Sequence, residues 1–128
     1  MSVPKLLVVD DSQAVRIAVR RILLNAGFEV ITAADGVQAI ERLREEPALM
    51  ILDVNMPALD GYGVCEKMRE FGSRYARLPI VFLTGVESRA MELLGREFGA
   101  YLRKPVREQE LISVVKQQLA AVSENSMN

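Results

Sequence analysis

The chain has 128 residues, 50% of them hydrophobic and 26% charged, and its formal net charge is −1. This length fits one domain of ordinary size, and the near-neutral charge gives no general attraction to nucleic acid or to acidic lipid. The sequence contains one cysteine and no histidine. These counts exclude an internal disulfide, most acid–base triads and the commonest zinc sites.

No segment predicts membrane insertion or export. The longest apolar runs, such as residues 80–83, are far too short to cross a bilayer. Residues 1–5 lack the apolar core of a signal peptide. We therefore expect a cytoplasmic protein that binds no membrane and does not bind nucleic acid directly.

Short apolar runs alternate with stretches of helical periodicity. In chain order, the predicted elements are a strand at residues 6–9, a helix at 15–23, a strand at 30–31, a helix at 37–43, a strand at 49–52, a helix at 64–68, a strand at 80–83, a helix at 91–98, a strand at 101–102 and a helix at 111–122. The short runs are continuously apolar, which is typical of strands buried on both faces. Ser12 is the expected N-cap of the first helix, and Gly27 and Gly99 are expected to end the first and fourth helices.

This order predicts an α/β fold in which a doubly wound parallel sheet carries helices on both faces. In such sheets, ligands bind at the carboxyl ends of the strands, where the winding reverses. We expect one domain over residues 1–122. Residues 123–128 are expected to form a flexible tail or the start of a linker.

Acidic residues follow two of the predicted strands. Asp10 and Asp11 follow the first strand, and Asp53 follows the third. Taken singly, each is more often the cap of the next helix. If the first and third strands flank the reversal, however, the three carboxylates converge. Their mutual repulsion then favours a hard divalent cation such as Mg²⁺.

Two further strand ends carry groups suited to a phosphoryl ligand. The fourth strand ends in Thr84-Gly85, and the fifth leads to Lys104. A bound cation and the Lys104 ammonium would offset the charge of the phosphoryl oxygens, and Thr84 would donate a hydrogen bond. Asp53 is then the predicted nucleophile, which forms an acyl phosphate.

The complete set resembles the CheY-like receiver domain of response regulators in two-component signalling, over about residues 5–122. The matching motifs are Val8-Val9-Asp10-Asp11-Ser12, Asp53-Val54-Asn55-Met56-Pro57 with Asp60-Gly61, Leu83-Thr84-Gly85 and Tyr101-Leu102-Arg103-Lys104-Pro105. The resemblance implies a flavodoxin-like sheet of five strands in the order 2-1-3-4-5.

The resemblance also implies a role for each acidic residue. Asp53 would be the phosphoacceptor and a metal ligand. Asp11 would bind Mg²⁺ (or Mn²⁺) directly, Asp10 would bind it mostly through water, and the backbone carbonyl of Asn55 would be a further ligand.

The remaining residues of the set have switching or structural roles in this resemblance. Thr84 and Tyr101 would move toward the phosphoryl group, and Lys104 would pair with its oxygens. The structural residues at the site would be Pro105, after a cis peptide bond, and Pro57 and Gly61 in the turns that hold Asp53.

Because the chain has no histidine, a partner must carry the phosphohistidine, either a histidine kinase or a phosphotransfer protein. The resemblance implies a switch that catalyses only its own aspartyl phosphorylation and dephosphorylation and acts on a downstream effector domain or protein. It allows a dimer through the face formed by the fourth helix, fifth strand and fifth helix. The chain is expected to be either a stand-alone receiver or part of a multidomain regulator or hybrid kinase. Arg16, Arg20 and Arg21 predict a solvated helix face, part of which could dock a kinase.

Two other function classes share part of this chemistry. A phosphatase of the haloacid-dehalogenase type also uses aspartate, Mg²⁺, Thr and Lys, but its first strand is followed by Asp-x-Asp-x-Thr, whereas this chain reads Asp10-Asp11-Ser12-Gln13. Activity on a generic phosphomonoester would distinguish it. A nucleotide-binding flavodoxin-like protein would need a glycine-rich phosphate loop after the first strand, and the sequence has none there.

The chain departs from the family pattern at two places that bear on switching. Asn55 and Val86 would lie on either side of the path by which a water molecule attacks the phosphoryl group. The Val86 side chain cannot hydrogen-bond this water, so we predict slow to moderate self-dephosphorylation. Many receivers read Gly-Ala-Asp-Asp-Tyr before the fifth strand, whereas this chain reads Gly99-Ala100-Tyr101 and lacks two residues there. We expect the surface at this shortened connection to differ from the common one.

Overall fold

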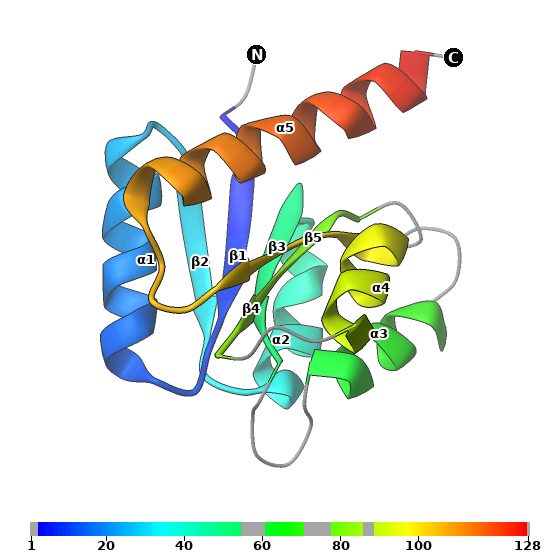
Figure 1. Cartoon of the computed structure of the whole chain (residues 1–128), viewed down its shortest axis with the longest axis horizontal. Coiled ribbons are helices and arrows are strands. Elements are labelled where there is room, and N and C mark those ends of the chain that lie inside the picture. The colour runs from blue at the N-terminus through cyan, green and yellow to red at the C-terminus, as the bar shows by residue number, and fades with distance from the viewer. Residues whose placement is uncertain (1–2, 55–60, 71–77, 86–88, 128) are drawn as a thin grey trace.

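The computed structural model describes residues 3–54, 61–70, 78–85 and 89–127 of the chain. The elements in chain order are β1 (Lys5–Val9), α1 (Gln13–Asn25), β2 (Glu29–Ala33), α2 (Gly36–Arg42), the 3₁₀ turn η1 (Leu43–Glu45), β3 (Leu49–Asp53), α3 (Gly61–Glu70), β4 (Ile80–Thr84), α4 (Arg89–Phe98), β5 (Gly99–Arg103) and α5 (Glu108–Met127). The predicted alternation of strands and helices is confirmed over these residues (Figure 1).

The strands form one parallel sheet in the order β2-β1-β3-β4-β5. This order confirms the doubly wound, flavodoxin-like fold. The chain first moves outward from β1 to β2 and then crosses back to β3, so the winding reverses between β1 and β3. Because all strands run in the same direction, their carboxyl ends lie together at one edge of the sheet.

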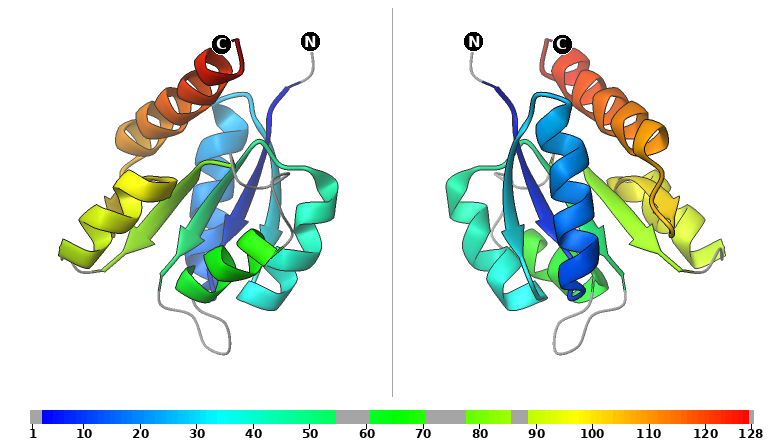
Figure 2. Two further views of the ribbon diagram at one scale, coloured as in Figure 1. Left: turned by 90° about the vertical axis from the view of Figure 1, so that its right-hand side faces the viewer. Right: turned by 90° about the vertical axis from the view of Figure 1, so that its left-hand side faces the viewer.

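Helices cover both faces of the sheet (Figure 2). Helices α1 and α5 pack on one face, and α2, α3 and α4 pack on the other. Every residue of β3 and β4 is buried, as their apolar runs predict. Phe98 of α4 meets Phe82 of β4 edge to face, with ring centroids 6.1 Å apart. Burying one large apolar side chain contributes about 1.5–3 kcal/mol, so this two-sided core holds the strand ends in place.

The residues at the two ends of α1 have the capping roles predicted for them. The Ser12 side chain accepts a hydrogen bond from the N–H of Val15, which satisfies one of the free donors of the first turn. After the helix, Gly27 has a φ of 97°, a conformation that favours glycine. Local sequence signals therefore determine where this helix begins and ends.

Two chain connections bear on the predictions. Helix α4 ends at Phe98 and β5 begins at Gly99, so no residue separates them. Helix-to-strand connections in α/β units usually have about 2–6 residues, so the connection is short, as predicted. At the C-terminal end, the expected tail from Ser123 is helical as far as Met127, because residues 108–127 contain neither Pro nor Gly to stop α5. No helix among the described residues is long and apolar enough to span a membrane.

Candidate functional site

Four strands deliver polar residues to the same edge of the sheet. Asp53 and Thr84 are the last residues of β3 and β4, while Asp10 and Lys104 directly follow β1 and β5. Thr84 is in register with Arg103, and the N–H of Lys104 donates to the carbonyl of Thr84 at 2.7 Å. The parallel register therefore brings together side chains that are far apart in the sequence.

The three predicted acidic residues meet at this edge. A carboxylate oxygen from each of Asp10, Asp11 and Asp53 lies within 4.8 Å of the other two. Asp10 is fully buried and Asp53 is 3% exposed, whereas Asp11 is exposed. Like charges at such distances repel strongly where water is partly excluded. The cluster therefore favours a positively charged partner.

Both the side chain and the backbone carbonyl of Asp10 accept hydrogen bonds. Its Oδ1 accepts a hydrogen bond from the N–H of Ser12 at 2.9 Å, and its backbone carbonyl accepts one from Nη1 of Arg16 at 2.6 Å. The Arg16 contact was not predicted, since the sequence places this residue only on a solvated helix face. The Oδ2 of Asp10 is buried and faces the Lys104 ammonium. Such an oxygen is suited to a cation or an ordered water.

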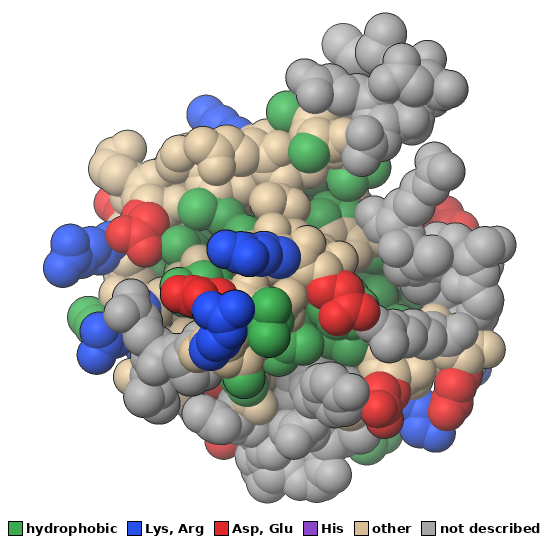
Figure 3. All heavy atoms as spheres, turned by 45° about the vertical axis from the view of Figure 1, so that its right-hand side comes forward, with side chains coloured by type: hydrophobic (Ala, Val, Ile, Leu, Met, Phe, Trp, Pro, Cys, Tyr) green, Lys and Arg blue, Asp and Glu red, His purple; other side chains and the backbone are tan. Residues whose placement is uncertain are grey.

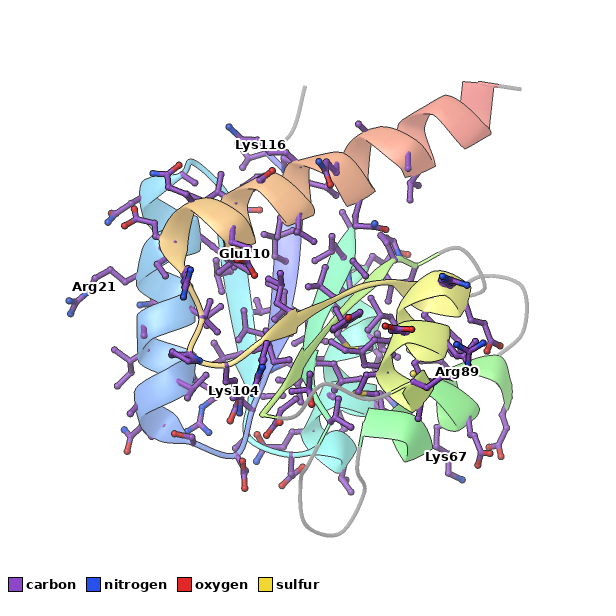
Figure 4. The ribbon with its side chains drawn as sticks, in the orientation of Figure 1. Arg21, Lys67, Arg89, Lys104, Glu110 and Lys116 are labelled. Atoms are coloured by element: carbon purple, nitrogen blue, oxygen red, sulfur yellow. The ribbon has the colours of Figure 1, made fainter. Side chains whose placement is uncertain are left out.

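Lys104 supplies positive charge within the cluster (Figure 4). Its Nζ lies 3.1 Å from Oδ2 of Asp10 and 3.4 Å from Oδ1 of Asp53. The first contact joins the ammonium to a fully buried carboxylate. Partial burial acts to lower the pKa of Lys104, but its contacts with Asp10 and Asp53 outweigh this effect and hold the pKa above its usual value. Lys104 is therefore charged at neutral pH.

Tyr101 lies on β5 in register with Phe82 of β4, two residues before the position opposite Thr84. It is partly buried and packs against the core beneath α4. Side chains alternate along a strand, so Thr84 and Tyr101 point to the same face of the sheet. The structure thus places Tyr101 within one pleat of the strand end that carries Thr84.

The structure describes some of the remaining predicted site residues and not others. The Lys104–Pro105 peptide bond is cis, the isomer that the resemblance implies. Gly61 is the first residue of α3. Three residues with predicted roles lie outside the described part of the chain, so those roles stay predictions: Asn55, Pro57 and Val86.

Residues 6–116 match the family model of the response regulator receiver domain. The chain belongs to this family. A match over these residues takes in the whole sheet apart from Lys5, the first residue of β1, and every residue of the acidic cluster. It supports neither the phosphatase nor the nucleotide-binding alternative.

This receiver domain resembles both longer regulators and a protein of similar length. It is 37% identical over 131 residues to the probable transcriptional regulator ycf27 of Porphyridium aerugineum, covering 100% of this chain and 53% of that protein. It is 41% identical over 115 residues to response regulator MprA of Mycobacterium leprae, covering 88% and 49%. The chemotaxis protein CheY4 of Vibrio cholerae superimposes with a TM-score of 0.82 at 34% identity, covering 91% and 98%. The chain spans about half the length of the curated relatives it matches.

The surface of the receiver domain beside Lys104 is hollowed. A pocket of about 410 Å³ is lined by Arg103, Lys104, Pro105, Arg107 and Glu110. Its lining carries more positive than negative charge, which suits the approach of an anionic phosphodonor. On the face shown in Figure 3, the described basic and acidic side chains are interspersed.

Mg²⁺ is expected to raise the thermal midpoint of this receiver domain, because a divalent cation relieves the repulsion among the three carboxylates. At a concentration of about 100 times Kd, binding adds about 2.7 kcal/mol to the free energy of unfolding. Replacing exposed Asp11 with Asn removes one of the three candidate ligands and is expected to abolish most of this increase. Thermal melts across an MgCl₂ titration measure it, with Glu41→Gln on α2 as the matched control. An equal shift in wild type and Asp11→Asn would rule out the cluster as the cation site.

Proposed function

We propose that this receiver domain accepts a phosphoryl group on Asp53 from the phosphohistidine of a partner histidine kinase or phosphotransfer protein, with Mg²⁺ bound. The position of Asp53 carries the proposal. Its carboxylate is nearly buried at a strand end, beside the carboxylates of Asp10 and Asp11 and 3.4 Å from the ammonium of Lys104. A nucleophile of this kind needs mainly positioning and charge neutralisation.

In the proposed step, a carboxylate oxygen of Asp53 attacks the phosphorus atom of the donor. The P–N bond of phosphohistidine breaks as the O–P bond of the acyl phosphate forms, and its electron pair returns to the imidazole, which takes up a proton. When bound, Mg²⁺ would neutralise charge on the phosphoryl oxygens, with Asp10, Asp11 and Asp53 as its protein carboxylates. Lys104 would exchange its contact with Asp53 for one with a phosphoryl oxygen, and Thr84 would donate a hydrogen bond.

The output would follow from the added charge. A phosphoryl group at Asp53 would change the contacts of Thr84 and Tyr101, and through them the face formed by α4, β5 and α5. The effector is proposed to be a downstream domain or protein. The match to regulators about twice as long as this chain, one of them a probable transcriptional regulator, favours a domain of the same polypeptide. Whether phosphorylation also produces a dimer through this face is tested by size-exclusion chromatography.

The experiment that tests the proposal uses a small phosphodonor. Wild-type protein incubated with acetyl phosphate and Mg²⁺ is expected to gain the mass of one phosphoryl group by intact mass spectrometry, and to gain none when the metal is chelated. Beryllofluoride, which mimics the phosphoryl group, is expected to bind under the same condition. Phosphoryl uptake that does not depend on Mg²⁺ would contradict the proposal.

Replacing Lys104 with Met is expected to slow phosphorylation by acetyl phosphate by about 10²-fold, the typical cost of removing one group that stabilises transition-state charge. The ammonium lies 3.1 Å from Asp10 and 3.4 Å from Asp53, so it is placed to act on a phosphoryl group at Asp53. Lys104→Arg keeps the charge and is the matched control, expected to retain more of the rate. The rates are measured by mass spectrometry at saturating Mg²⁺, and a wild-type rate in Lys104→Met would exclude the proposed role.

A further inference from the structure

The junction of α4 and β5 brings two glycines into unusually close contact with their surroundings. Gly99, the first residue of β5, has a φ of 156°, and a Cβ built on it would clash with the carbonyl oxygen of Ile80. Its own carbonyl accepts a hydrogen bond from Nε2 of Gln118 on α5 at 3.3 Å. The first residue of β5 is therefore in close contact with β4 and directly follows α4. This connection leaves α4 little freedom to move relative to β5.

Gly95 provides the space for the ring of Tyr101. It is buried within α4, and a Cβ built on it would lie 3.0 Å from Cδ1 of Tyr101. The same Cβ would lie 3.4 Å from the backbone of Ala100 and Tyr101. Apart from proline, glycine is the least favourable residue inside a helix. A packing role therefore accounts for glycine at this position: the Tyr101 ring occupies the place of the missing side chain.

The Tyr101 ring also has room to move. A pocket of about 410 Å³ opens beside it on the surface between α4 and β5, which lie next to each other in Figure 1. The residues that line this pocket are Glu92, Gly95, Arg96, Gly99, Ala100 and Tyr101. The ring therefore packs in a defined position against Gly95, which we call its seat, and it has open space next to it. A side chain with alternative positions requires both features.

In this structure, the Tyr101 ring lies in its seat at Gly95 while the phosphoacceptor site has one particular arrangement. In this arrangement Lys104 pairs with Asp53, a contact that a phosphoryl group on Asp53 would replace. Tyr101 lies on the same face of the sheet as Thr84, one pleat away on the adjacent strand. The ring therefore lies on the same face as the strand ends of the site, two residues along β5 from the position opposite Thr84.

We propose that Gly95 is the positioning residue for Tyr101: it stabilises the ring position that accompanies the Lys104–Asp53 pair, so that α4 opposes the phosphorylated state until the ring leaves its seat. This inference rests on the proposed phosphorylation of Asp53. A ligand that favours one of two states binds more tightly when the other is destabilised. Adding a methyl group at Gly95 penalises the seated state, because its tightest contact, 3.0 Å, is with the ring, whereas its backbone contacts at 3.4 Å have an ordinary van der Waals length.

The test compares beryllofluoride binding to wild type and Gly95→Ala in the presence of Mg²⁺. The chain has three tyrosines, so labelling with 3-fluorotyrosine gives few ¹⁹F resonances, and Tyr101→Phe assigns one of them. In Gly95→Ala, we expect the Tyr101 resonance of the free protein to move toward its beryllofluoride-bound position. We expect the dissociation constant for beryllofluoride to fall by roughly three- to tenfold. An unchanged or increased constant would overturn the inference.

Two further variants separate positioning from general packing. In a Tyr101→Ala background there is no ring to displace, so Gly95→Ala is expected to leave the dissociation constant unchanged, and a persisting effect would refute the role of the ring. Gln118→Ala breaks a junction contact without touching the seat, and it is expected to lower stability but not to change the affinity. If Gly95→Ala fails to fold, the double variant Gly95→Ala/Tyr101→Ala is expected to fold, and its failure would overturn the inference. Wild type that does not bind beryllofluoride would instead defeat the proposed function, and the inference with it.

Discussion

Replacing Asp53 with Asn is expected to reduce phosphoryl uptake from acetyl phosphate by at least about 10³-fold, as expected for loss of a catalytic nucleophile. The side-chain amide cannot form an acyl phosphate, yet it has nearly the same shape as the carboxylate. The substitution also removes one of three carboxylates that lie within 4.8 Å of one another. Folding should therefore be retained, with a free energy of unfolding equal to or above that of wild type without Mg²⁺.

The matched control for Asp53→Asn is Glu41→Gln, which also converts a carboxylate to an amide but at an exposed position on α2. It is expected to take up the phosphoryl group at the wild-type rate. Uptake is followed by intact mass spectrometry, and stability by urea denaturation. Substantial uptake in Asp53→Asn would mean that another residue is the acceptor.

Replacing Gly99 with Ala is expected to lower the free energy of unfolding by roughly 3 kcal/mol, at the upper end of what overpacking a well-packed site usually costs. A Cβ at Gly99 would clash with the backbone oxygen of Ile80, and it would lie 3.0 Å from the Ile80 nitrogen. Backbone atoms of a central strand cannot rotate away as a side chain can. Strand β5 would have to shift relative to β4, and a loss of about 10 °C in the thermal midpoint is expected for a domain of this size.

Gly85→Ala is the matched control for Gly99→Ala. Among the described residues, no atom would lie within 4 Å of a Cβ at Gly85, so this substitution is expected to change the free energy of unfolding by less than about 1 kcal/mol. Urea denaturation of both variants measures the difference. Equal stability of Gly99→Ala and Gly85→Ala would show that β5 can move away from β4 at little cost.

The edge of the sheet that carries the site could be predicted from the sequence alone. Apolar runs identify buried strands, and parallel strands end at one edge, so the sequence predicts that four residues meet there: Asp10, Asp53, Thr84 and Lys104. The structure places these residues together, with Lys104 in contact with both aspartates. This part of the prediction succeeded because it depends only on strand order and direction.

The contacts of individual side chains could not be predicted in this way. Arg16 has the sequence context of an exposed helix face, yet its guanidinium reaches the Asp10 carbonyl. Gly95 leaves no signal in a hydrophobic pattern because it has no side chain, although its close contact with Tyr101 shapes the surface beside the site. Such contacts depend on the distance between packed elements, which residue spacing does not determine. The hydrophobic pattern predicts that the last helix ends at Val122, whereas α5 continues to Met127. The polar residues after Val122 are compatible with a helix as well as with a tail.

The central claim, that Asp53 is the phosphoacceptor, is tested most directly by locating the acyl phosphate. Wild-type protein is phosphorylated with acetyl phosphate and Mg²⁺ and then reduced with borohydride, which converts an aspartyl phosphate to homoserine. Peptide sequencing by mass spectrometry then identifies the converted residue. Conversion at Asp53, and at neither Asp10 nor Asp11, is the predicted result. Conversion at either of the other two aspartates, or at none of the three, would contradict the claim.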